Sequence, residues 1–227
     1  SEASTKLAEG YAPEVETATG IERHSLLTMF AIRGYGYTGE EHFLAEGEKQ
    51  INLIREKLSA AKSLAAEQSF LLGLGERAKA AEEGVNNYEA YVKKTETLNG
   101  KMHETRTGLN NAAAEYMKHC TQFLAAQNEA MAKEIESGAA PSELKERLWK
   151  INLVNDIIDI GNATRIENYK AQALRNISMI EAAFGNFDKM DKMFADLRSV
   201  TRNAANISQI EATKAAMQAA AKELDFL

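Results

Sequence analysis

The sequence has few prolines, aromatic residues and cysteines, and each scarcity excludes a class of structure. Two prolines occur in 227 residues, and aromatic residues make up 7%. Because Ala, Glu, Lys and Leu are abundant and runs of β-branched residues are rare, helices are favoured over sheets. The lone cysteine, Cys120, excludes an internal disulfide. No apolar run approaches the roughly 18 residues that span a bilayer. We therefore predict an all-α fold.

Several kinds of functional site are also missing from the sequence. The net charge is −6 and no block of Lys and Arg stands out, which argues against nucleic acid as a partner. No phosphate-binding loop, dinucleotide fingerprint or haem motif occurs. The four histidines show no metal-ligand spacing and no recurring Glu-x-x-His pattern. We therefore expect no enzyme, no metal and no cofactor. The histidines are His24, His42, His103 and His119.

Hydrophobic periodicity predicts four helical tracts: residues 14–33, a second from residue 38, a third from residue 81, and a fourth over residues 142–227. In "TGEE", Thr38 is a candidate N-cap and Glu41 completes a capping box. Glycines 73 and 75 can interrupt the second tract. Gly138 suits a helix end, Pro141 suits the next helix start, and Ser142 can cap that helix. The apolar stripe of the second tract consists of Leu44, Ile51, Ile54, Leu58 and Ala61.

The third tract keeps its heptad spacing through Gly100, which is either a tight turn or a glycine inside one long helix. Both alternatives fit the spacing. A tract of about 58 residues is about 87 Å long at 1.5 Å per residue. Helices of this length predict an elongated antiparallel bundle. The stripe consists of Val85, Tyr88, Val92, Thr95, Asn99, Met102, Arg106, Leu109, Ala113, Tyr116, Cys120 and Phe123.

Polar residues on apolar stripes are the best candidates for a binding site. Arg33 shares a helix face with Leu26, Met29 and Phe30, and Arg106 is in phase with the third tract. In the fourth tract, four polar or aromatic residues occupy positions of the apolar stripe itself: Asn155, Asn162, Arg165 and Tyr169. Three alternatives stay open for each arginine. It pairs with a Glu or Asp of a neighbouring helix, it extends outward to solvent at a corner, or it binds a small carboxylate through a bidentate fork.

The stretches "ERHSLLTMFAIRGYGYTGEEHF" and "NATRIENYKAQALRNISMIEAAF" resemble the helical bimodular (HBM) sensor domain of bacterial methyl-accepting chemotaxis receptors. The resemblance covers nearly the whole chain. It implies one extracytoplasmic sensor domain over residues 1–227, with two stacked four-helix modules built from about six helices. It also implies a membrane-proximal module from both chain ends and a distal module from the middle of the chain. Because the chain starts at Ser1 without Met, we expect a fragment of a longer receptor.

The resemblance implies a periplasmic domain of an inner-membrane receptor, which binds a small organic acid and signals through a small helix shift. Membrane helices would flank the fragment, and we expect a homodimer. By position, Arg23, Arg33, Arg198 and Arg202 would serve the proximal pocket, and Arg165 with its neighbours the distal one. A periplasmic binding protein is another partner known in the family. The alternative function is a helical sensor or interaction bundle that recognises a protein partner and binds no small ligand.

Overall fold

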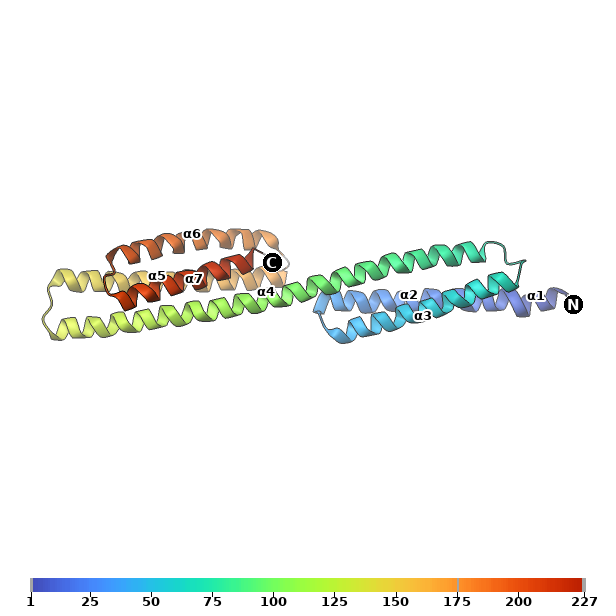
Figure 1. Ribbon diagram of the computed structural model, residues 1–227, viewed down its shortest axis with the longest axis horizontal. Helices are drawn as coiled ribbons and strands as arrows, with labels where there is room; N and C mark the ends of the chain where they lie inside the picture. Colours follow the sequence, from blue (N-terminus) through green and yellow to red (C-terminus); the bar gives the residue numbers. More distant parts are fainter. Residues whose placement is uncertain (1, 175, 226–227) are drawn as a thin grey trace. The chain divides into compact units, whose positions relative to one another are not determined.

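The computed structural model describes residues 2–174 and 176–225, without the side chains of Ile177 and Ala182. Every regular element in these residues is helical, which confirms the all-α prediction (Figure 1). There are six continuous helical segments in the described ranges. The first consists of α1 (Glu2–Lys6), the π-helical η1 (Leu7–Tyr11) and α2 (Ala12–Thr38). The others are α3 (Glu41–Glu67), α4 (Leu74–Glu136), α5 (Pro141–Leu174), α6 (Ile177–Val200) and α7 (Ala204–Leu224).

The chain divides into two compact units, residues 1–101 and residues 102–227, and the boundary falls inside α4. The first unit holds α2, α3 and the first part of α4, whereas the second holds the rest of α4 with α5, α6 and α7 (Figure 1). The first unit therefore differs from the four-helix module that the resemblance implies. The helices near the two chain ends belong to different units.

The first unit packs α2 closely against α3. A Cβ atom at Gly47 of α3 would lie 2.3 Å from Cδ1 of Ile32 on α2, so a larger residue at this position would displace the Ile32 side chain. All five residues that were predicted as the α3 stripe are buried. Tyr35 of α2 and Val92 of α4 complete one core cluster with Ile51. The backbone carbonyl of Tyr35 also accepts a hydrogen bond from Asn99 of α4, at 3.2 Å.

The second unit has a larger core, in which all four helices take part. Tyr116 and Phe123 of α4, Ile157 of α5, Leu197 of α6 and Met217 of α7 belong to the same buried cluster. Connections of two to four residues join the helices, which produces an up-down-up-down arrangement. The α4 stripe is confirmed at Ala113, Tyr116, Cys120 and Phe123, which are all at most 8% exposed.

Several predicted helix boundaries were wrong. Thr38 ends α2 instead of capping α3, and its hydroxyl accepts a hydrogen bond from the N–H of Glu40. Gly39, at φ 73°, makes the corner. The fourth tract is three helices, because Asn176 and Asn203 each cap a new helix with their side-chain oxygens. The predicted break before Pro141 is confirmed, and Gly138 has φ 73° there.

Within the described residues, we find no helix that combines the length and the apolar character required to cross a membrane.

Gly100 lies inside α4, so the long-helix alternative is the one that the structure contains. An added Cβ would meet no atom within 4 Å. We therefore expect Gly100→Ala to raise the free energy of unfolding by about 0.5–1 kcal/mol, because alanine loses less backbone entropy in a helix. Urea denaturation followed by circular dichroism measures this change.

Gly39→Ala is the matched control, since the positive φ of Gly39 strains an L-residue. We expect this variant to lose about 1 kcal/mol. A loss of stability in Gly100→Ala would contradict a continuous α4.

Candidate functional site

The candidate site is a cavity of about 50 Å³ inside the second unit. All four helices of the unit contribute to its wall, and most of the side chains there are apolar. Helix bundles commonly hold ligands in such spaces between facing helices. The lining residues are Leu109, Ala113 and Tyr116 of α4; Gly161, Thr164, Arg165 and Asn168 of α5; Phe187 and Met190 of α6; and Met217, Ala220 and Leu224 of α7.

One end of the cavity wall is fixed by the contact between Tyr116 and α5. The Tyr116 hydroxyl donates a hydrogen bond to the carbonyl of Ile157 at 2.6 Å and lies 3.4 Å from Sδ of Met190. A Cβ at Gly161 would lie 2.7 Å from Cε1 of Tyr116, so α5 can approach the ring only through glycine. This contact determines which face of α5 is turned toward α4.

Two buried polar side chains of α5 line the cavity. Thr164 is 6% exposed, and its hydroxyl accepts a hydrogen bond from Asn186 of α6 at 3.0 Å. Asn168 is 4% exposed, and its Oδ1 accepts from Nε2 of Gln172 at 3.0 Å. Gln172 in turn accepts from Nε of Arg106 at 2.9 Å. Arg106 is thus linked to the cavity wall through Gln172 and Asn168.

Arg165 borders the cavity from an exposed position on α5. Its guanidinium has no hydrogen bond or ion pair with any residue that the structure describes. One turn further along α5, the Tyr169 hydroxyl donates to Oδ1 of Asn110 at 3.2 Å, but this side chain is 52% exposed. Arg165 is the one predicted site residue on the cavity wall.

The predicted inward face of α5 was wrong by one residue. Each predicted position directly follows a buried or cavity-lining one. The buried positions of α5 are Lys150, Val154, Ile157, Thr164, Asn168 and Ala171. One residue rotates a side chain by 100° around the helix, so the predicted row faces outward. The row consists of Asn155, Asn162, Arg165 and Tyr169, of which only Asn162 is half-buried. The missed residues were Thr164 and Asn168, which a stripe anchored on Val154 and Ile157 would have found.

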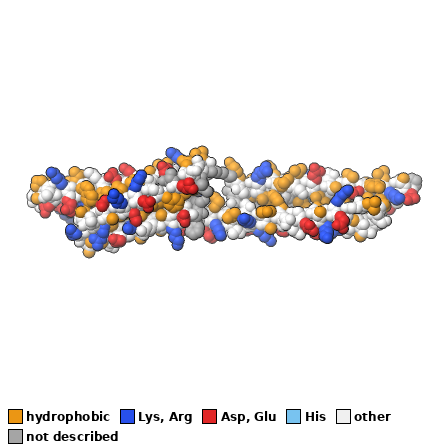
Figure 2. All heavy atoms as spheres, turned by 90° about the horizontal axis from the view of Figure 1, so that it is seen from above, with side chains coloured by type: hydrophobic (Ala, Val, Ile, Leu, Met, Phe, Trp, Pro, Cys, Tyr) orange, Lys and Arg blue, Asp and Glu red, His pale blue; other side chains and the backbone are white. Residues whose placement is uncertain are grey.

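The other predicted arginines also lie outside the cores. Arg33 does share a face with Leu26, Met29 and Phe30, but this face is exposed. Thr28, Ala31 and Tyr35 face the core instead. Figure 2 shows apolar side chains at the surface of the half that contains the first unit, to which Arg33 and Phe30 belong. The prediction of inward arginines was therefore wrong for Arg33, Arg106 and Arg165, which are exposed. The arginines that were candidates by position in the resemblance are exposed as well: Arg23, Arg198 and Arg202.

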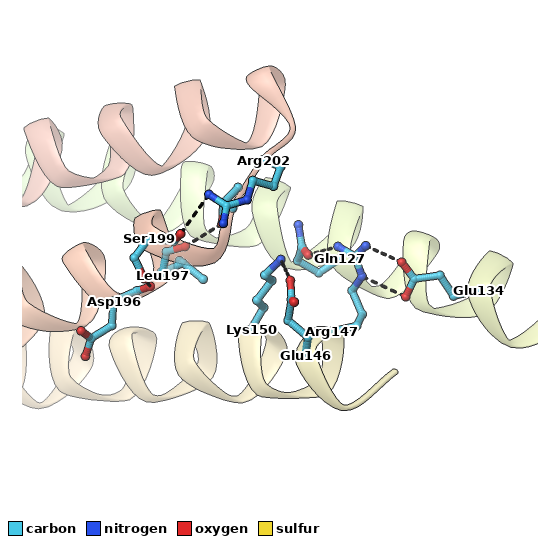
Figure 3. A network of polar contacts seen from close by, with 10 residues as sticks. Gln127, Glu134, Glu146, Arg147, Lys150, Asp196, Leu197, Ser199 and Arg202 are labelled. Atoms are coloured by element: carbon cyan, nitrogen blue, oxygen red, sulfur yellow. Dashed lines mark hydrogen bonds and ion pairs between the residues drawn. The ribbon is translucent and has the colours of Figure 1, made fainter. Parts of the chain in front are cut away.

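Arg202 belongs to a polar cluster around the turn between α4 and α5 (Figure 3). There, Arg147 of α5 donates to both carboxylate oxygens of Glu134 and to Oε1 of Gln127. The Lys150 ammonium donates to Glu146 at 2.6 Å. Arg198 is separate from this cluster, and its Nε lies 3.5 Å from Oε1 of Glu211.

These groups offer no covalent chemistry that the geometry supports. Cys120 is 2% exposed, and burial raises the pKa of its thiol to about 12. Burial likewise raises the pKa of the Tyr116 phenol. Both groups are therefore neutral near pH 7, and a neutral thiol is a poor nucleophile. In the described ranges, no three His, Cys, Asp or Glu side chains are grouped closely enough to hold a metal ion.

The raised pKa of Cys120 predicts a loss of stability in alkaline solution. Below about pH 8.5 the thiol is neutral in both states, so its contribution is fully present. Above this pH the unfolded chain ionises first, and the free energy of unfolding falls by about 1.4 kcal/mol per pH unit until the folded pKa is reached. Urea denaturation at pH 8.5 and pH 10 should show an excess loss of about 2 kcal/mol relative to Cys120→Ala. Equal losses in both proteins would contradict the raised pKa.

Comparison with known proteins found no family, no curated protein and no solved structure that matches this chain.

Proposed function

We propose that this chain is a helical ligand-binding sensor domain that takes a short aliphatic carboxylate into the cavity of its second unit. The supporting observation is that the guanidinium of Arg165, which has no partner among the described residues, borders a mostly apolar cavity between four helices. An apolar cavity with one cation at its edge fits a ligand that has one apolar end and one anionic end. The carboxylate would bind Arg165 as a bidentate fork.

The volume limits the apolar part of the ligand. An engineered cavity of about 150 Å³ in another protein holds benzene, so a cavity of about 50 Å³ suits a chain of a few carbon atoms. The buried polar groups Thr164 and Asn168 already have partners, at 3.0 Å in each case. A second carboxylate placed in the cavity would therefore lack a cation. This favours monocarboxylates over dicarboxylates and tricarboxylates.

Sensing would follow from the position of α7. A ligand on Arg165 would touch α5 at one end and Met217, Ala220 and Leu224 of α7 along its tail. If the ligand prefers one packing of α7 over another, binding shifts the population toward this packing. In the chemoreceptor that the sequence resembles, such a shift would pass to flanking membrane helices from a periplasmic domain.

A second candidate function is an interaction bundle that recognises a protein partner. The observation that favours it is the number of large apolar side chains exposed on α2, including Phe30 at 74% and Leu26 at 57%. This candidate requires no small ligand, so the experiment below separates the two functions.

We predict that butyrate raises the melting temperature of the protein by more than succinate and citrate do at equal ionic strength. At ten times the dissociation constant, a ligand stabilises the folded state by about 1.4 kcal/mol, which corresponds to roughly 3–6 °C for a chain of this size. Arg165→Ala should abolish the excess shift of butyrate over succinate and citrate. Differential scanning fluorimetry and calorimetric titration measure these effects.

Two variants make the result specific to the cavity. Arg23→Ala removes an exposed arginine of the first unit and should leave the shift unchanged. Ala220→Leu adds apolar volume at the cavity wall, so it should abolish the shift while Arg165 is intact. Absence of any carboxylate-dependent shift, together with higher basal stability in Ala220→Leu, would overturn the ligand proposal and favour the interaction bundle.

A further inference from the structure

We propose that the second unit has another binding site, for a small oxyanion such as a carboxylate, phosphate or sulfate. Its donors are Gln127 of α4, Lys150 of α5 and Arg202 of the turn between α6 and α7. None of these residues lines the cavity around Arg165. The two proposals are therefore independent of each other.

The first observation is a buried side-chain amide, that of Gln127, whose N–H donors have no acceptor among the described residues. Gln127 is 0% exposed. Its Oε1 accepts a hydrogen bond from Nη1 of Arg147, but its Nε2 has no partner among the described residues. Buried polar groups nearly always have a hydrogen-bond partner, and an unsatisfied one destabilises the fold. The Gln127 amide therefore requires an acceptor that the described residues do not supply.

The second observation is a nearly buried ammonium close to this amide. The side chain of Lys150 is only 8% exposed, and its ammonium donates to Glu146 at 2.6 Å. Arg147 pairs with Glu134. Arg202 is exposed and lies near Lys150 in the view of Figure 3. Because a buried ammonium is costly without hydrogen-bond partners, the remaining N–H groups of Lys150 favour a further acceptor.

Neither carboxylate is free to satisfy Gln127. Glu134 accepts two hydrogen bonds from Arg147, of which the one from Nε is 3.2 Å long. Hydrogen bonds from Arg147 lower the pKa of Glu134, and a hydrogen bond from Lys150 lowers the pKa of Glu146. Both carboxylates are thus ionised and already engaged. Lys150 uses one of its three N–H donors for Glu146, and Arg202 donates to the carbonyl of Ser199 at 3.3 Å.

An oxyanion satisfies both requirements at once. Its oxygens can accept hydrogen bonds from the amide, the ammonium and the guanidinium, and these bonds are strengthened by its charge. A water molecule has fewer acceptor sites than an oxyanion and carries no charge that attracts Lys150 and Arg202. Figure 3 shows the ends of Gln127 and Lys150 close together in the view, with Arg202 near them. Arg202 is also close enough to lower the pKa of Glu146. A bound oxyanion would connect α4 and α5 with the turn that leads into α7.

The test measures the melting temperature of the full chain in sulfate, phosphate and formate, against sodium chloride at the same ionic strength. We expect each oxyanion to raise it by a few degrees more than chloride does, with saturation. The side-chain amide resonance of Gln127 in a ¹H–¹⁵N NMR spectrum should shift along the same titration curve. The three oxyanions together identify which class of anion the site prefers.

Three variants make the test specific. Lys150→Met removes the buried cation and should abolish the excess shift. Gln127→Glu keeps an acceptor for Arg147 and places a carboxylate inside the site, so oxyanions should no longer stabilise the protein. The matched control is Lys133→Met, because Lys133 makes the same i,i+4 pair with Glu129 but with side chains 71% and 68% exposed. Lys133→Met should retain the full oxyanion effect.

The outcomes of this test and of the cavity test are distinct. Arg165→Ala and Ala220→Leu should leave the sulfate effect unchanged. The oxyanion proposal is overturned if sulfate, phosphate and formate act no more strongly than chloride, and if the Gln127 amide resonance does not shift. It is also overturned if Lys133→Met and Lys150→Met reduce the effect equally, since this would indicate general screening of charges.

Discussion

Both units build their cores on one stripe of α4, and the rest of the structure depends on this stripe. It extends from Val85 in the first unit to Phe123 in the second, with steps of three and four residues throughout. A long helix that stood alone would be only marginally stable in water, so α4 relies on the helices that cover its stripe. The stripe is exposed only near the boundary between the units, at Met102 and Arg106. This explains why a glycine at position 100 is tolerated: no side chain is needed there for packing.

Close contacts through small residues decide which faces of the other helices are buried. On α5, the ring of Tyr116 fits only against Gly161, and this contact fixes the rotation of the whole helix. On α2, Ile32 packs against Gly47, and the small side chains of Thr28 and neighbouring residues face the core. The same face of α2 also buries the large side chains of Ile32 and Tyr35. Arg33 is on the exposed face of this helix and is consequently outside the core.

This explains how much of the fold and the site could be predicted. Where a helix buries large apolar residues, as α3 does with Ile51 and Leu58, spacing alone identified the core. The α5 helix mixes polar and apolar residues on every face, so its sequence did not distinguish the buried row from the next one, and the prediction missed by one residue. Tertiary partners supply the missing information, because Thr164 is buried with a hydrogen bond from Asn186 of another helix. Arg165 was predicted as an inward residue but is exposed; it borders the cavity because a long side chain next to a buried row can still reach it.

The two proposed sites have opposite chemistry, yet both involve α7. The apolar cavity contacts its C-terminal half through Met217 and Leu224, whereas the polar cluster includes Arg202, which directly precedes the Asn203 cap. A ligand at either place can bias the packing of α7 only if it binds one arrangement more tightly than the other. An oxyanion at the polar cluster would hold the start of α7 in one place, so a carboxylate in the cavity would then act on a helix that is anchored at one end. If both sites are occupied together, the two ligands become energetically coupled through α7, and this coupling must be equal in both directions.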